Sequence, residues 1–245
     1  MDSSGEFKRK INELAQSEDI IEGIYNYCDR RCERCRFTTK CLSYVSSPGS
    51  NDLSEEETTE YVANNLEATG LMLDEIAGDN DINLFPLAGD EKDPERHEPF
   101  RDNLSFSANV IAKETHKWLQ AIEPSTGIRK VNSLKLYDEH RKDYHEALED
   151  ILYYLFFVAV KLDRAVMAFP GSDDDEYRER NSNGSAKVAL IAIDRTLKAW
   201  GVIVKERPEY EDPILDIIIK NEKLRSDIEK RFPGARSFIR PGLDE

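Results

Sequence analysis

Apolar residues recur at intervals of three and four along most of the chain, which is the spacing of amphipathic helices. Alternation with a period of two, which is typical of a half-buried strand, does not extend over any useful length. The pattern predicts helices at residues 6–16, 17–35, 55–77, 101–122, 132–169, 186–206 and 213–232. We therefore expect an all-α protein, a multi-helix bundle that carries a distinct N-terminal segment.

Two of the predicted helices are apolar on nearly every face. One contains the run ILYYLFFVAV from Ile151 to Val160, and the other covers residues 186–206. A helix of this kind is typically surrounded by other helices in the middle of a bundle. The run of ten residues is far shorter than the roughly 20 that a membrane-spanning helix needs, and the start MDSSGEFKRK lacks the apolar stretch of a signal peptide. We expect a cytoplasmic protein with no membrane partner.

Residues that break helices divide the chain. Pro48 and Gly49 predict a loop at 46–54, with Ser54 as the N-cap of the helix that follows. Residues 78–99 form a polar connection, and the charged stretch 172–185 has the composition of a loop. We expect residues 1–50 to form N-terminal helices with the cysteine segment, and residues 51–245 to form the bundle, with one continuous core joining both parts.

The net charge of -15 is unevenly distributed. Fifteen acidic and two basic residues lie between Asp52 and Glu98, whereas the stretch from Cys28 to Cys41 contains five basic and two acidic residues. Basic neighbours would lower the pKa of thiols and stabilise a thiolate centre. A nucleic-acid site is the alternative interpretation, but the overall charge would repel a polyanion. We therefore expect a protein partner rather than a nucleic acid.

The clearest chemical signal is the motif CDRRCERCRFTTKC. It contains all four cysteines of the chain, Cys28, Cys32, Cys35 and Cys41, with the spacing C-x3-C-x2-C-x5-C. Soft thiolates select zinc or iron–sulfur clusters, and clustered thiols in a reducing compartment favour a metal site over disulfides. These four residues are the predicted metal ligands.

The identity of the metal depends on the local backbone. If Cys28, Cys32 and Cys35 lie on one helix, the outer two are roughly 10 Å apart along its axis, which suits the corners of a cubane better than a single ion. This geometry favours a [4Fe-4S] cluster over zinc, and a helix break near Arg31 would reverse the preference. The first three cysteines also have the spacing of radical S-adenosylmethionine enzymes, but the helical pattern cannot supply the strand-and-helix barrel of those enzymes.

Two adjacent Asp–Arg pairs lie within the apolar helices. Buried charges are costly unless they are paired, so a crossed network between the helices is expected if they lie side by side. The alternative is a pocket for an anion or small molecule, bounded by the two arginines and by Tyr153 or Tyr154. The residues concerned are Asp163, Arg164, Asp194 and Arg195.

Three stretches carry a resemblance to a known group of proteins: YCDRRCERCRFTTKC, NGSAKVALIAIDRTLKAW and FPGARSFIRPGLDE. Together they resemble a group of bacterial all-helical proteins of uncharacterised function that share this N-terminal cysteine motif and C-terminal signature. The resemblance implies a metal-binding helical protein and implies no activity.

Two classes of function follow. The first is a metalloprotein whose four-cysteine centre is structural, redox-active or sensing, with protein–protein interaction as its output. The second is an enzyme that binds a small substrate near the Asp–Arg pairs, with the metal only bracing the fold. A pocket with unpaired Arg164 and Arg195 would favour the enzyme, and a filled, paired interior would favour the interaction protein.

Overall fold

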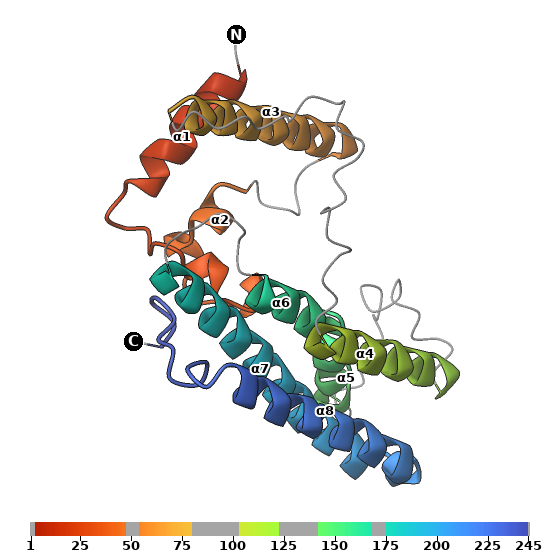
Figure 1. The fold of residues 1–245 in the computed structure, drawn as a ribbon. Coiled ribbons are helices and arrows are strands. Elements are labelled where there is room, and N and C mark those ends of the chain that lie inside the picture. Colours follow the sequence, from red (N-terminus) through yellow and green to blue (C-terminus); the bar gives the residue numbers. More distant parts are fainter. Residues whose placement is uncertain (1–2, 48–53, 80–102, 123–141, 168–174, 245) are drawn as a thin grey trace, which may run out of the picture. The chain divides into compact units, whose positions relative to one another are not determined.

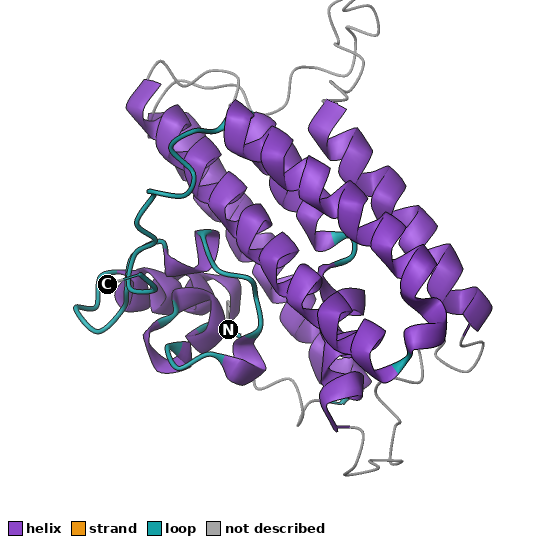
Figure 2. Ribbon diagram, turned by 90° about the horizontal axis from the view of Figure 1, so that it is seen from below, coloured by secondary structure: helices purple, strands orange, loops and turns teal. Residues whose placement is uncertain are grey.

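The computed structural model describes residues 3–47, 54–79, 103–122, 142–167 and 175–244. Every regular element in these ranges is a helix, which confirms the predicted all-α class (Figures 1 and 2). The chain forms two compact units, Met1–Pro99 with Pro241–Glu245, and Phe100–Arg240. No helix within the described residues is long and apolar enough to cross a membrane.

The N-terminal unit contains two longer helices and a set of short turns (Figure 1). Helices α1 (Ser3–Ala15) and α3 (Glu55–Asp79) pack against each other. Between them along the chain lie the 3₁₀ helices η1 (Ile24–Asn26), η2 (Cys32–Arg34) and η3 (Thr38–Lys40) and the single turn α2 (Leu42–Val45).

Helix α3 begins where the sequence predicts. The Ser54 hydroxyl accepts a hydrogen bond from the Glu57 amide at 3.2 Å, and the Glu57 carboxylate accepts one from the Ser54 amide at 2.7 Å. This reciprocal capping box satisfies amide groups that the first turn leaves without helical partners. The Ser54 amide and hydroxyl both donate to the Glu57 carboxylate, and these two hydrogen bonds lower its pKa. Ser54 is therefore confirmed as the N-cap.

The described residues of the second unit form a bundle of five α-helices with α7 at its centre. Helices α5, α6 and α8 all pack on α7, and α4 packs on α6 and α8 (Figure 1). One core cluster joins α4, α6, α7 and α8, and a second is built around Trp200 on α7. The helices are α4 (Asn103–Ile122), α5 (Lys142–Tyr154), α6 (Phe157–Val166), α7 (Asp175–Glu206) and α8 (Glu211–Arg231).

The sequence predicts a single helix at 132–169, and the structure divides its described part into α5 and α6. The break is a turn at Leu155 and Phe156, after which the Val160 amide donates to the Phe156 carbonyl at 3.3 Å. The sequence did not indicate this turn, because apolar residues occupy every helix face and the pattern is the same before and after residues 155 and 156. Residues 132–141 and 168–169 lie outside the described residues.

The prediction of a loop over 172–185 is wrong from Asp175 onward, where α7 begins. Burial explains the difference: Asn181 and Ser185 are polar, yet their side chains are buried in the bundle. Packing of this segment outweighs the low helix propensities of serine, asparagine and glycine. The small side chains of Ala186, Ala189 and Ala192 continue the buried face, which allows neighbouring helices to approach closely.

The predicted division at residue 50 also differs from the structure. The boundary lies at Pro99, because α3 packs on α1 and belongs to the N-terminal unit. Both apolar core clusters consist of residues from the second unit. The predicted core that joins both parts stays a prediction.

Candidate metal centre

The predicted helix at 17–35 is wrong, and this changes the setting of the cysteines. Gly23 has φ 69° and Arg30 has φ 61°, values that end a right-handed helix. The chain instead forms η1 and η2, separated by irregular backbone. Because 3₁₀ turns also align residues three apart, they reproduce part of the spacing that predicted an α-helix.

Each cysteine lies at or beside a turn. Cys28 follows η1, Cys32 and Cys35 begin and follow η2, and Cys41 lies between η3 and α2. Cys35 and Cys41 both have extended backbone dihedrals, with ψ 126° and ψ 113°. The four residues thus come from successive turns of one compact loop rather than from one face of a helix.

Two hydrogen bonds close this loop. The Ile21 amide donates to the Lys40 carbonyl at 2.9 Å, which joins the beginning of the segment to the residue before Cys41. Arg30 Nη1 donates to Ser43 Oγ at 3.2 Å, which joins the region of the first three cysteines to the turn after Cys41. These contacts hold all four cysteines within one small structure.

The electrostatics of Cys32 show that the thiols influence one another. Burial raises the pKa of the Cys32 thiol most, and Cys28, Cys41 and Cys35 each raise it further, whereas Arg30 lowers it. A cation bound among the thiols would reverse this penalty, because metal ligation favours the deprotonated form. All four cysteines are free thiols and are partly buried.

Backbone groups also interact with two sulfur atoms. The Phe37 amide lies 3.4 Å from Cys35 Sγ and donates to it, and Cys28 Sγ donates to the Tyr25 carbonyl at 3.6 Å. These hydrogen bonds fix the Cys35 and Cys28 side chains relative to the backbone of the loop.

The described part of the chain nevertheless contains no assembled metal site. Among the described residues, no three Cys, His, Asp or Glu side chains are close enough together to hold a metal ion. Ligation of one ion by Cys28, Cys32, Cys35 and Cys41 would require side-chain movements within the loop. Metal binding thus remains a prediction, whereas the placement of all four cysteines in one closed loop is a finding.

The break at Arg30 removes the reason for preferring a cluster. That preference required Cys28, Cys32 and Cys35 on one continuous helix, with the outer two far apart along its axis. Arg30 has a left-handed φ and Cys32 begins a 3₁₀ turn, so that continuous helix is absent. The geometric argument for [4Fe-4S] over zinc therefore no longer applies.

Arg31 is a neighbour of the cysteines whose environment the sequence did not reveal. Its side chain is only 5% exposed, and Nε lies 2.7 Å from Glu33 Oε1. The Arg31 amide also donates to Asp29 Oδ1 at 3.4 Å. The acidic residues of the motif are thus used within the loop.

The Asp–Arg residues of the bundle adopt a different arrangement from the predicted network. Asp194 on α7 pairs with Arg225 on α8 and with Arg236 beyond it. Arg195 Nη1 donates to the buried Tyr154 hydroxyl at 2.5 Å, and its guanidinium lies 5.8 Å from the centre of that ring. Asp163 is exposed on α6 and Arg164 is partly buried. Although α6 and α7 are neighbours, no Asp–Arg ion pair joins them within the described residues.

The interior of the bundle contains a small cavity. The cavity beside Tyr154 has a volume of about 20 Å³, enough for about one water molecule. Burial and the nearby Arg240 charge lower the pKa of Arg195. The cavity beside Tyr154 is therefore too small for a substrate.

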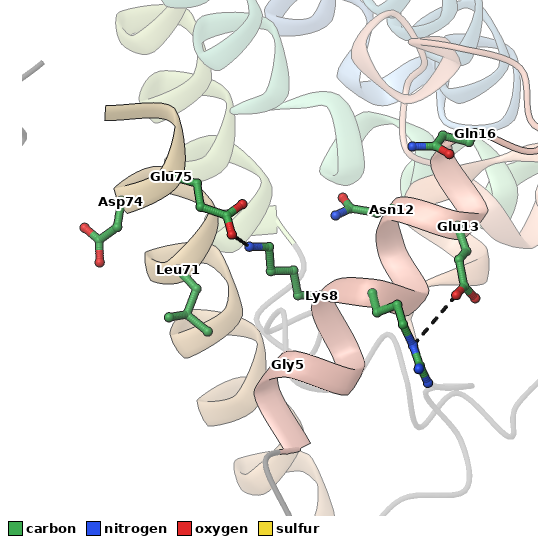
Figure 3. Close-up of a pocket in the computed structure, with 9 residues that line it drawn as sticks. Gly5, Lys8, Asn12, Glu13, Gln16, Leu71, Asp74 and Glu75 are labelled. Atoms are coloured by element: carbon green, nitrogen blue, oxygen red, sulfur yellow. Dashed lines mark ion pairs between the residues drawn. The ribbon is translucent and has the colours of Figure 1, made fainter. Parts of the chain in front are cut away.

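A larger groove of about 790 Å³ lies between α1 and α3 in the N-terminal unit (Figure 3). Figure 3 shows that the Lys8 and Glu75 side chains meet across it as an ion pair. Arg9 lies 3.7 Å from Glu13 on the same helix. The groove is wide open and many of its charges neutralise one another, so its chemistry favours no particular ligand.

Comparison with family models, curated proteins and solved structures finds no match for the chain.

Proposed function

We propose that the four-cysteine loop binds one zinc ion, that the ion is a structural staple of the N-terminal unit, and that the protein acts through protein–protein interaction. The observation that carries this proposal is the closed loop that places the four cysteines on successive turns. Within it, Cys28, Cys35 and Cys41 each raise the pKa of Cys32. Four thiolates are a complete ligand set for structural zinc.

The small core of the N-terminal unit supports a structural role. Its buried side chains among the described residues are Ile24, Tyr27, Arg31, Ala68 and Ala77. Two of these are alanines and one is charged, so hydrophobic burial contributes little stability there. Small units of this kind commonly depend on a metal or a disulfide, and here the thiols are free.

An output through interaction is supported by the bundle. The cavity beside Tyr154 is too small for a substrate, and Arg195 donates a hydrogen bond to the Tyr154 hydroxyl. Large apolar side chains are exposed in pairs one turn apart, Phe106 with Val110 on α4 and Leu215 with Ile219 on α8. Exposed apolar pairs are more typical of a contact surface than of a catalytic site. The enzyme alternative therefore has less support.

Metal analysis of the purified protein tests the proposal. We expect one zinc ion per chain and no acid-labile sulfide after anaerobic purification. Cobalt should replace the zinc and give the visible spectrum of tetrahedral thiolate coordination. Cys32→Ser and Cys41→Ser should lose the metal, whereas the matched control Thr39→Ala, at an exposed position of the same loop, should retain it.

Iron and sulfide in equal amounts, lost in the same cysteine variants, would replace the zinc staple by a cluster and make electron transfer or sensing the leading function. A parent protein that contains neither metal and takes up neither zinc nor cobalt would overturn the proposal.

A further inference from the structure

The C-terminal end of the chain belongs to the N-terminal unit. Residues Pro241–Glu245 cluster with Met1–Pro99, although the residues before them, through Arg240, belong to the bundle. The segment that carries the four cysteines and the last residues of the chain are thus parts of one compact structure. More than 190 residues separate them along the sequence.

The contact is made at Gly242. Its φ of 67° lies in the left-handed region, which glycine adopts without the cost that other residues incur. A Cβ atom at this position would lie 2.7 Å from Ile21 Cδ1 and 3.0 Å from Ile21 Cγ2. Both the backbone conformation and the space therefore require glycine, and the tail backbone rests directly on the Ile21 side chain.

Ile21 connects this contact to the cysteine loop. Its amide donates to the Lys40 carbonyl at 2.9 Å, and Lys40 precedes Cys41 directly. A displacement of Ile21 would therefore act on the backbone that presents the fourth cysteine. The path from Gly242 to Cys41 consists of one side-chain contact, one hydrogen bond and one peptide bond.

We infer that residues 241–244 are a built-in part of the metal unit, with Gly242 as a positioning residue that holds Ile21 and thereby Cys41. The inference rests on the proposed metal function. It implies that zinc and the docked tail stabilise each other: the tail increases zinc affinity, and zinc increases the fraction of molecules in which the tail is docked. Such coupling is reciprocal by thermodynamic necessity.

Zinc titration of the full chain, in competition with a chromophoric chelator, tests the first half of this coupling. Gly242→Ala should weaken zinc binding at least about fivefold, the lower end of typical coupling strengths. The matched control is Gly70→Ala in α3 of the same unit, where an added Cβ meets no atom within 4 Å and affinity should be unchanged. A chain ending at Arg240 should show the same loss as Gly242→Ala.

Hydrogen exchange tests the second half and separates coupling from a general loss of fold. In the parent protein the amides of Gly242, Leu243 and Asp244 should exchange more slowly when zinc is bound. In Cys41→Ser, added zinc should leave their exchange unchanged. These amides report the docking of the tail itself, which a defect elsewhere in the unit would not alter in a zinc-dependent way.

The outcomes distinguish this inference from the function on which it rests. A parent protein without zinc would overturn both. Zinc bound equally tightly by the parent, Gly242→Ala and the shortened chain, with tail exchange independent of zinc, would overturn the coupling and leave the zinc staple intact.

Discussion

Arg236 forms a bidentate pair of hydrogen bonds with the Asp194 carboxylate: Nη1 lies 2.6 Å from Oδ2 and Nη2 lies 3.3 Å from Oδ1. Its Nε donates at 2.9 Å to Glu229 near the end of α8. These hydrogen bonds raise the pKa of Arg236. One side chain thus ties the segment after α8 to the middle of α7.

We expect Arg236→Lys to destabilise the bundle by about 1 kcal/mol, because lysine cannot form the two parallel hydrogen bonds. The estimate is small because the Arg236 side chain is 42% exposed and solvent weakens the ion pairs. Urea unfolding followed by circular dichroism measures it. Arg180→Lys, at an exposed position of α7, is the matched control and should leave the free energy of unfolding unchanged. Equal stability of both variants would show that the two hydrogen bonds to Asp194 contribute nothing to the free energy of unfolding.

Gly201→Ala should stabilise the bundle. Gly201 lies inside α7, is exposed, and has no atom within 4 Å of the position that a Cβ would occupy. Alanine is favoured over glycine in a helix interior by roughly 0.5–1 kcal/mol, mainly because glycine loses more backbone entropy on folding. The free energy of unfolding from urea titration should rise by that amount. A decrease would mean that this face of α7 is covered by another part of the protein.

Trp200 allows a sharper test of the core. Its side chain is fully buried, and the indole N–H has no hydrogen-bond partner among the described residues. Trp200→Phe removes that donor, which offsets much of the cavity it leaves, so the free energy of unfolding should change by less than about 1 kcal/mol. Trp200→Ala should cost about 3–5 kcal/mol.

Tyr154→Phe is the matched comparison, because the Tyr154 hydroxyl accepts a hydrogen bond from Arg195. Removing it should cost about 1 kcal/mol, more than Trp200→Phe. A loss of 2 kcal/mol or more in Trp200→Phe would show that the indole has a partner, such as a water molecule in the adjoining cavity of about 20 Å³.

Local signals predicted the helices that the sequence located correctly. Ser54 and Glu57, the two partners of the capping box, lie within four consecutive residues. The start of α3 could therefore be predicted without tertiary information. The prediction of a helix at 17–35 was wrong for the opposite reason. Its apolar residues have helical spacing, but Gly23 and Arg30 adopt left-handed dihedrals that nothing in the local pattern required of Arg30.

The residues that contact the candidate sites could not be predicted from the sequence, because they come from distant positions of the chain. Asp194 was expected to pair with a residue of the preceding helix, yet its partners are Arg225 and Arg236. The closing sequence RPGLDE contains a glycine after proline, which predicts a turn but not that Gly242 would rest on Ile21. Periodicity identifies which face of a helix is buried, and it does not identify what covers that face.

The last prediction concerns Cys32 in the metal-free protein, whose thiol pKa is raised by burial and by the neighbouring thiols. An unfolded cysteine deprotonates near pH ~8.5. Between that pH and the higher pKa of the folded state, the folded protein binds more protons than the unfolded chain, so stability falls as pH rises through this window and is constant below it.

The pH dependence of alkylation by iodoacetamide, resolved for each cysteine by mass spectrometry, measures this pKa. The midpoint pH for alkylation of Cys32 should lie above that measured in denaturant. Arg30→Gln should raise the midpoint further, because the Arg30 charge lowers the pKa, and Thr39→Ala should leave it unchanged. A midpoint at or below that of the denatured chain would contradict the crowding of thiols on which the zinc proposal depends.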